Sequence, residues 1–464
     1  MRALDCAQTS AVISSYAQTP DGAPTEKSFA VERLEKIFGG SLYTSVFSAL
    51  PPLERMCYAA EARMCAGRFD QRTEAVLQQV LTPLGLYAPP LGDVHAIQNA
   101  NASLSAPAAR AALGETIRLS QSRIDRYSDC RLRWFLEYML SLQDTAPFEF
   151  RPVDTGNFVH GVLERFLLET QKSGALLGAL TQTDIRAAAA RLCTAETEKI
   201  ARACGGAGGR LLFFFDRLQK NLELILTSLN DEFANTAFQP VLFEYKIGFA
   251  GGHAPLSIPL PDGGVAEIRG VADRIDVYRA GTCVFIRVAD YKTGDKTFRE
   301  EDLSRGKNLQ LPVYLLTLCS VCDESFLKKI GASRTDKLIP AGASYFVVKP
   351  PRLRLDAPPC RDMYGDAVRA LRREGILSAD EKIAGCADTS EDRRFSAKLI
   401  RKNEREMDAL FNTVKAVVCR VACDMRAGRI DCADTQSGAK SPCRYCPYTA
   451  LCRGEKSKGG EFND

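Results

Sequence analysis

The sequence has 464 residues, of which 45% are apolar and 25% are charged, and its formal net charge is +4. This composition is typical of globular proteins, the length suffices for roughly two or three domains, and the mild charge does not by itself indicate a nucleic-acid partner. No apolar run approaches the roughly 20 residues that a membrane-spanning helix needs. The first residues also lack the pattern of a signal peptide. We therefore expect a cytoplasmic protein that is not bound to a membrane.

Residues 1–115 are predicted to form a separate, helical segment. Helical patterns around residues 30–38 and 52–80 lead into a stretch rich in Pro, Gly, Ser and Asn, which is typical of a linker. Residues 116–464 are predicted to form the second domain. The phosphate-binding motif G-x-x-x-x-G-K-[ST] occurs nowhere in the sequence, so no ATP site is expected.

The middle of the chain alternates helical and strand patterns. Val159, Val162, Leu163 and Phe166 give an amphipathic helix that also carries His160, and a lone histidine on a helix is more often structural than a ligand. Helical periodicity continues from Thr181 to Phe238, with a Gly-rich break at 204–210. Residues 241–249 then read as a strand in which Glu244 either approaches a site or lies at a sheet edge. Residues 343–348 supply a later strand.

The stretch from Glu267 to Lys292 predicts a β-hairpin. Two runs rich in Val, Ile, Phe and Tyr flank the short polar break R-A-G-T. With Ala280 and Gly281 as a two-residue turn, Asp273 is expected opposite Val288.

Because side chains alternate along a strand, Asp273, Asp290 and Lys292 are predicted to share one face of this hairpin. Ile275, Val277, Val284 and Ile286 lie behind them on the same face. Two carboxylates and one ammonium group at the mouth of an apolar sheet are costly unless they are paired.

A divalent cation such as Mg²⁺, or Mn²⁺, would resolve this cost, because it takes carboxylate ligands and retains waters that can act as nucleophiles. Lys292 could orient such a water. The alternative is a surface hairpin whose acids pair with Arg274, Arg287 and Lys292.

The sequence G-V-A-D-R-I-D-V-Y, followed by V-A-D-Y-K-T-G, resembles the core of RecB-like nucleases in the PD-(D/E)XK superfamily. The resemblance implies an α/β fold in which a central mixed sheet carries the active site and is flanked by helices, with long helical insertions. It also implies Mg²⁺-dependent phosphodiester hydrolysis. In this assignment Asp273 and Asp290 bind the metal, the Tyr291 carbonyl assists and Lys292 helps to activate water.

Two further segments resemble the same family, in the family's order. His160 lies in a G-x-x-x-H-x-x-L-E context that matches the metal-binding histidine, and Glu164 either orients it or faces solvent. Gln310 and Tyr314 match the Q-x-x-x-Y motif, which implies contacts to DNA near the scissile phosphate. Without the acids upstream, an amide and an aromatic side chain on one helix face would be interpreted as ordinary residues at the edge of the core.

The sequence contains 17 cysteines, and three near its end, Cys443, Cys446 and Cys452, have the spacing C-x2-C-x5-C that indicates a metal. Their spacing alone favours zinc and an iron–sulfur cluster equally. A fourth ligand must come from elsewhere. The resemblance implies that Cys130 is this ligand and that the four cysteines bind a 4Fe-4S cluster, which links the C-terminus to the domain. The residue after Cys130 is Arg131, where the family usually has Pro.

The resemblance is strongest to the AddB family of nuclease subunits from bacterial helicase-nucleases. It implies cleavage of single-stranded DNA during double-strand-break repair by homologous recombination, with an AddA-type helicase-nuclease subunit as partner. Residues 1–115 would then be the tail of a helicase-like region. The alternatives are a stand-alone RecB-like or Cas4-like nuclease and an inactive DNA-binding scaffold. The intact Asp273, Asp290 and Lys292 argue against the scaffold.

Overall fold

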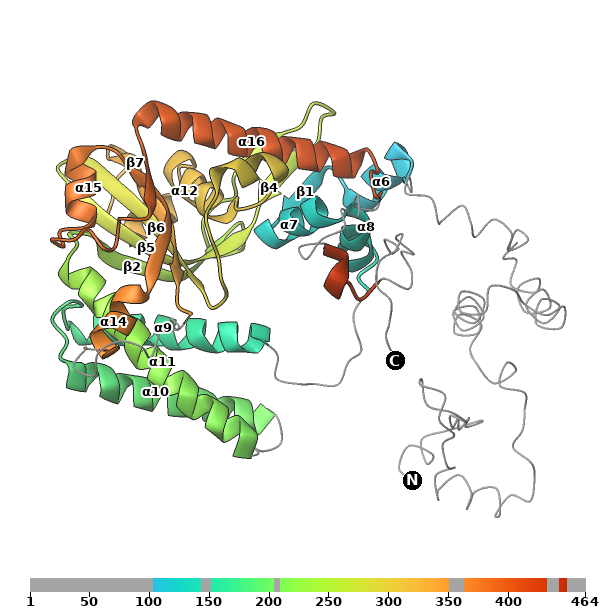
Figure 1. The fold of residues 1–464 in the computed structure, drawn as a ribbon. Helices are drawn as coiled ribbons and strands as arrows, with labels where there is room; N and C mark the ends of the chain where they lie inside the picture. The colour runs from blue at the N-terminus through green and yellow to red at the C-terminus, as the bar shows by residue number, and fades with distance from the viewer. Residues whose placement is uncertain (1–102, 143–151, 204–208, 350–362, 432–441, 449–464) are drawn as a thin grey trace, which may run out of the picture. The chain divides into compact units, whose positions relative to one another are not determined.

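The computed structural model describes residues 103–142, 152–203, 209–349, 363–431 and 442–448 (Figure 1). Most of the predicted segment 1–115 lies outside these residues, so the two-domain division stays a prediction. No helix in the described part of the chain is long and apolar enough to cross a membrane.

In chain order the elements are α6 (Ala106–Leu113), β1 (Thr116–Leu119), α7 (Gln121–Asp129), α8 (Arg131–Trp134), η3 (Phe135–Met139), α9 (Pro152–Ser173), α10 (Gln182–Ala203), α11 (Gly209–Ala234), β2 (Gln239–Ile247), β3 (Ser257–Pro259), β4 (Val265–Ile268), β5 (Gly270–Ala280), β6 (Cys283–Lys292), η4 (Glu300–Arg305), α12 (Gln310–Ser320), α13 (Glu324–Lys329), β7 (Lys337–Val347), α14 (Met363–Ala370), β8 (Arg372–Ser378), α15 (Glu381–Ala387), β9 (Leu399–Lys402), α16 (Glu404–Arg426) and η5 (Pro442–Tyr445).

Six strands form a mixed sheet in the order β2-β5-β6-β7-β8-β9. The neighbours β2, β5 and β6 are antiparallel, whereas β7 runs parallel to β6. On the far side, β8 is antiparallel to β7, and β9 runs parallel to β8. A smaller sheet has the order β1-β4-β3. The predicted α/β fold with a central mixed sheet flanked by helices is confirmed.

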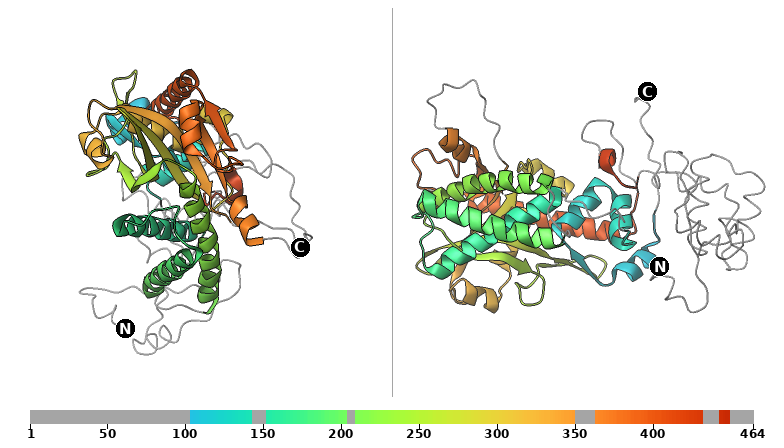
Figure 2. Two further views of the ribbon diagram at one scale, coloured as in Figure 1. Left: turned by 90° about the vertical axis from the view of Figure 1, so that its left-hand side faces the viewer. Right: turned by 90° about the horizontal axis from the view of Figure 1, so that it is seen from below.

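The two faces of the six-stranded sheet pack against different helices. Figure 1 shows α16 along one side and α9, α10 and α11 along the other. The face that carries Ile275 and Val288 packs against buried side chains of α12 and α16 in one apolar cluster. The opposite face packs Tyr291 and Phe346 against α9, α10 and α11, which Figure 2 shows as a group beside the sheet. The hairpin β5–β6 therefore lies between two helical layers.

The predicted hairpin is present, but its turn lies one residue later than predicted. Ala280 pairs with Cys283, so Gly281 and Thr282 form the turn. Gly281 has a φ of 61°. A two-residue hairpin turn needs a positive φ at its first position, and glycine adopts that conformation without the steric cost that Ala280 would meet there.

The later turn changes the pairing of the acidic residues. The predicted pair Asp273–Val288 is wrong, because Val288 pairs with Ile275. Continuing the same register by one residue beyond its last pair, Arg274 with Ala289, sets Asp273 opposite Asp290. The register moves by two residues in total, which preserves the alternation of faces. The two carboxylates are therefore closer together than predicted, on the face they were predicted to share.

Most predicted elements appear with shifted ends. The strand predicted at 241–249 is β2, and the strand predicted at 343–348 is the end of the longer β7. The helical stretch from Thr181 to Phe238 forms α10 and α11. At the end of the predicted segment 1–115, α6 begins after its N-cap Ser105 and buries Ala109 beside α16.

Candidate active site

Three ligand-bearing side chains converge at one end of the β2–β5–β6 sheet. A nitrogen of His160 on α9 and carboxylate oxygens of Glu244 on β2 and Asp273 on β5 all lie within 4.8 Å of one another. His160 Nδ1 is 3.4 Å from Asp273 Oδ2 and 3.6 Å from Glu244 Oε1. Its other nitrogen, Nε2, is 2.9 Å from the carbonyl oxygen of Tyr291. The structure thus brings together His160, Asp273 and the Tyr291 carbonyl, as predicted.

The acids of this group are buried. Asp273 is 7% exposed and Asp290 is 1% exposed. Burial raises the pKa of Asp273 to about 8, and the adjacent charge of Asp290 acts in the same direction. Burial also raises the pKa of Asp290, against the charge and hydrogen bond of Lys292. Two buried carboxylates that favour protonation form a site at which a cation is strongly favoured.

Without a metal, His160 supplies part of the missing positive charge. Burial lowers the pKa of His160, but the hydrogen bond to Glu244 and the charges of Asp273 and Asp290 outweigh burial and raise its pKa to about 9. A protonated imidazole donates from both nitrogens, which fits its contacts to the carboxylates and to the Tyr291 carbonyl. The same imidazole must lose its proton to bind a metal.

Asp290 is held by two polar side chains from different elements. Lys292 Nζ is 2.5 Å from Oδ2, and Gln310 Nε2 donates to Oδ1 at 2.5 Å. Gln310 is the first residue of α12, and this position brings the predicted Q-x-x-x-Y motif to the acids. Tyr314 follows one turn later and is only 4% exposed. Both motif residues therefore face the sheet, and their contact with DNA stays a prediction.

Glu244 was undecided from the sequence, and the structure places it in the site. Its backbone has a φ of 44°, which is uncommon for a residue other than glycine and costs about 1–3 kcal/mol. Its neighbours pair in regular register, Phe243 with Arg274 and Tyr245 with Ala272, so Glu244 lies beside Asp273. The signal in the sequence was an acid in the strand that precedes the hairpin, but only strand pairing reveals that this strand adjoins β5.

The opposite face of the hairpin carries a separate buried charge network. Glu232 on α11 pairs with Arg274, Arg287 and Arg373, at 2.9, 3.2 and 2.7 Å. Asp276 pairs with Arg274 at 2.9 Å and with Arg287 at 2.8 Å. The alternative was that the acids pair with Arg274, Arg287 and Lys292. It is wrong for the two arginines, because they lie on the other face and are already paired, whereas Lys292 does pair with Asp290.

Two of the three predicted C-terminal cysteines are described, and they lie near Cys130. Cys130 is buried between α7 and α8, and its Sγ accepts from the Arg133 backbone N–H at 3.5 Å. Burial raises the pKa of Cys446, and the adjacent thiols of Cys130 and Cys443 raise it further. Cys452 lies outside the described residues.

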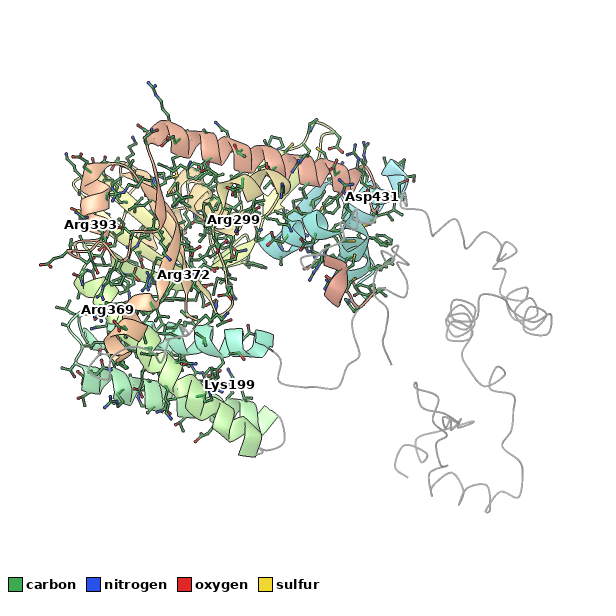
Figure 3. The ribbon with its side chains drawn as sticks, viewed as in Figure 1. Lys199, Arg299, Arg369, Arg372, Arg393 and Asp431 are labelled. Atoms are coloured by element: carbon green, nitrogen blue, oxygen red, sulfur yellow. The ribbon has the colours of Figure 1, made fainter. Side chains whose placement is uncertain are left out.

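Residues near the C-terminal cysteines contact the segment that contains α7 and α8. Arg131 Nη1 contacts Asp431 Oδ2 at 2.6 Å, and Figure 3 labels Asp431 beside these helices. The Tyr127 hydroxyl donates to the Arg429 carbonyl at 3.0 Å, and the Tyr448 hydroxyl donates to a backbone carbonyl at 3.1 Å. Arg131, which stands where the family usually has Pro, thus has a pairing role of its own.

Comparisons with known proteins agree with this geometry. The model of the PD-(D/E)XK nuclease superfamily matches residues 118–453. The AddB component of an ATP-dependent helicase/deoxyribonuclease from Lacticaseibacillus casei is 31% identical over 272 residues, which are 58% of this chain and 22% of that protein. Proteins of the same name from Clostridium acetobutylicum and Caldanaerobacter subterraneus are 25% and 26% identical over 364 residues, 73% and 75% of this chain and 30% and 31% of theirs.

The chain thus spans less than a third of the length of these relatives. The family match covers both the hairpin that carries Asp273, Asp290 and Lys292 and the helix that carries His160. By this match and this geometry, the chain belongs to the PD-(D/E)XK nuclease superfamily.

Proposed function

We propose that this chain is a metal-dependent deoxyribonuclease that hydrolyses phosphodiester bonds of single-stranded DNA. The observation that carries the proposal is the group of His160, Glu244 and Asp273, with Asp290 and Lys292 on the adjacent strand. Buried carboxylates, an imidazole and a backbone carbonyl are suitable ligands for a hard divalent cation such as Mg²⁺ or Mn²⁺.

Phosphodiester hydrolysis needs an in-line nucleophile and stabilisation of the charge that develops on the phosphate. A bound Mg²⁺ would polarise the phosphate and lower the pKa of a water. Asp273, Asp290, His160 and the Tyr291 carbonyl would hold it, and Glu244 lies within reach of the same position.

The remaining polar groups act on the reacting atoms or on the ligands. Lys292 brings a positive charge to the position beside Asp290, where it can orient a water and offset negative charge on the phosphate. Gln310 fixes one oxygen of Asp290 from α12, so the carboxylate enters the reaction in one orientation. His160 has to release a proton before it binds a metal, so metal uptake by this chain should release protons.

We also propose that Cys130, Cys443, Cys446 and Cys452 hold a 4Fe-4S cluster. Thiolates are the donors that such clusters require, and Cys446 lies near two of the other three cysteines. A link between Cys130 and the C-terminal cysteines would close a very long loop. The cluster would therefore stabilise the domain and needs no redox role.

The relatives are named as components of an ATP-dependent helicase/deoxyribonuclease. We infer that the chain works with an AddA-type helicase-nuclease partner that supplies ATP-driven unwinding, in double-strand-break repair by homologous recombination. This sequence has no ATP-binding loop motif of its own, which is consistent with a partner that supplies the unwinding.

The test is cleavage of end-labelled single-stranded DNA by the full chain, alone and with an AddA-type partner, in Mg²⁺, in Mn²⁺ and in excess chelator. We expect cleavage that requires the cation and is lost in Asp290→Asn. Cleavage that persists in the chelator, or in Asp290→Asn, would overturn the proposal. Equal cleavage of single-stranded and duplex DNA by the chain alone would contradict the substrate assignment.

A further inference from the structure

A second lysine lies beside the acids of the active site. Lys296 is in the loop after β6, and its Nζ is 5.4 Å from the centroid of the Tyr345 ring. Lys292 Nζ is 5.5 Å from the same centroid. Tyr345 on β7 pairs in register with Asp290, so the ring that contacts both ammonium groups belongs to the strand next to the metal ligands.

The two lysines differ in their partners. Lys292 is paired with Asp290. Lys296 is half-buried and forms no ion pair with a carboxylate among the described residues. Its positive charge nevertheless reaches the site: burial raises the pKa of Asp290, and Lys296 is among the groups that lower it. Lys296 also lowers the pKa of Asp125 on α7, which burial raises, but no described carboxylate lies within ion-pair distance of its Nζ. The ammonium group is therefore available to an anion.

The loop that carries Lys296 is fixed on both sides. At its start, the backbone N–H of Val348 donates to the Lys292 carbonyl at 2.9 Å. At its end, the buried Phe298 donates its N–H to Glu374 at 3.3 Å. Both ends of the loop are therefore anchored to the sheet, and Lys296 lies between these anchors.

Tyr345 supports the two ammonium groups without forming a hydrogen bond of its own. It is fully buried, and its hydroxyl has no hydrogen-bond partner among the described residues. The negative face of an aromatic ring attracts ammonium groups, which would hold Lys292 and Lys296 together despite their mutual repulsion.

We propose that Lys296 is a phosphate-binding residue of the active site and that the Tyr345 ring positions it next to Lys292. The anion is a backbone phosphate of the DNA strand that lies at the acids. This inference rests on the proposed function, because it takes DNA as the substrate. In this arrangement Lys292 serves the reacting phosphate, and Lys296 holds the strand in register.

The test measures binding of a short single-stranded oligonucleotide to the full chain in chelator, at several salt concentrations. Each phosphate neutralised on a single strand contributes about 0.7 to the slope of log K against log salt. Lys296→Gln should therefore reduce this slope by about 0.7 and weaken binding about fivefold at about 0.1 M salt. Lys296→Arg should keep the slope.

Lys382→Gln is the matched control, because this exposed lysine lies on α15, which packs on the other face of the sheet. We expect its slope to equal that of the wild type. Tyr345→Phe should keep the slope, and Tyr345→Leu should reduce it as Lys296→Gln does. If Tyr345→Leu fails to fold, the Lys296 variants decide the question alone.

An unchanged slope in Lys296→Gln overturns the inference, and so does a wild-type chain that binds no oligonucleotide. These outcomes are separate from failure of the proposed function. A wild type that cuts DNA, with an unchanged slope in Lys296→Gln, leaves the nuclease proposal intact and removes only the phosphate contact. A reduced slope in a chain that never cuts would support the contact and contradict the nuclease.

Discussion

Tyr314 on α12 packs directly onto Gly270, the first residue of β5. A Cβ atom at position 270 would overlap the hydroxyl and ring carbons of Tyr314. The glycine at the start of G-V-A-D-R-I-D is therefore required for the approach of α12, which carries Gln310 to Asp290 one turn before Tyr314. The contact links a motif on the sheet to a motif on the helix.

Gly270→Ala should displace α12 and with it Gln310. We expect a loss of about 1–3 kcal/mol in the free energy of unfolding, as for other overpacked cores. Cleavage should fall by about 10²-fold, because a shift of about 1 Å near the reacting groups has that effect. Gly385→Ala is the control, since a Cβ there meets no atom within 4 Å. Wild-type cleavage and stability in Gly270→Ala would show that the contact is unimportant.

Removal of the Lys292 charge should separate metal binding from the rate of cleavage. In Lys292→Met, Asp290 Oδ2 loses its ammonium partner, so Mn²⁺ binding measured by calorimetry should be retained or tightened. The cleavage rate should fall by about 10²–10³-fold, as for the loss of one group that stabilises transition-state charge. Asp290→Asn should lose both.

Lys307→Met is the matched control for that experiment, because Lys307 pairs with Asp129 outside the group of acids. It should change neither metal binding nor the rate by more than a few-fold. Loss of Mn²⁺ binding in Lys292→Met would assign Lys292 a structural role in place of a catalytic one.

The buried network around Glu232 should be a major contribution to stability. Glu232→Gln leaves Arg274 and Arg287 with Asp276 and removes the carboxylate that pairs with Arg373. Breaking such a buried pair typically costs roughly 3–5 kcal/mol. Urea unfolding measures the loss. Glu169→Gln is the control: Glu169 pairs with Arg191 at the surface, where the expected change is under about 1 kcal/mol.

The same network predicts a pH dependence. Burial raises the pKa of Glu232, but the charges of Arg274, Arg373 and Arg287 outweigh burial and hold the pKa well below its usual value of 4.5. The folded state therefore binds this proton less readily than the unfolded state, so the contribution to stability is complete above about pH 4.5 and declines below it. The stability difference between wild type and Glu232→Gln should shrink by up to about 1.4 kcal/mol per pH unit in that range. A constant difference would contradict this sign.

The cysteine assignment predicts iron in the purified protein. Cys130→Ser and Cys443→Ser should each lower the iron content and the unfolding temperature of the anaerobically prepared chain, without changing the groups proposed to bind Mg²⁺. Cys322→Ser is the control, because Cys322 is exposed. Stoichiometric zinc without iron in the wild type would overturn the 4Fe-4S assignment in favour of a zinc site.

The sequence by itself determined the side-chain alternation that places Asp273, Asp290 and Lys292 on one face, because the two-residue period of a strand is a local property. It also predicted the helix that carries His160 and the helix that carries Gln310 and Tyr314. It did not determine the hairpin register, because both Ala280–Gly281 and Gly281–Thr282 are possible two-residue turns. The positive φ at the first turn position decided between them.

Only the tertiary structure decided which distant residues complete the site. Glu244 reaches Asp273 because β2 pairs with β5, and Tyr345 adjoins Asp290 because β7 pairs with β6. These pairings join residues 29 and 55 positions apart, as the register gives them, and no local pattern specifies them. Arg274 and Arg287 were alternative partners for the acids. Side-chain alternation along the strands places them on the opposite face, where they pair with the buried Glu232. Strand pairing and helix packing depend on residues far apart in the sequence. They therefore placed the residues of the site that the local pattern of the hairpin did not predict.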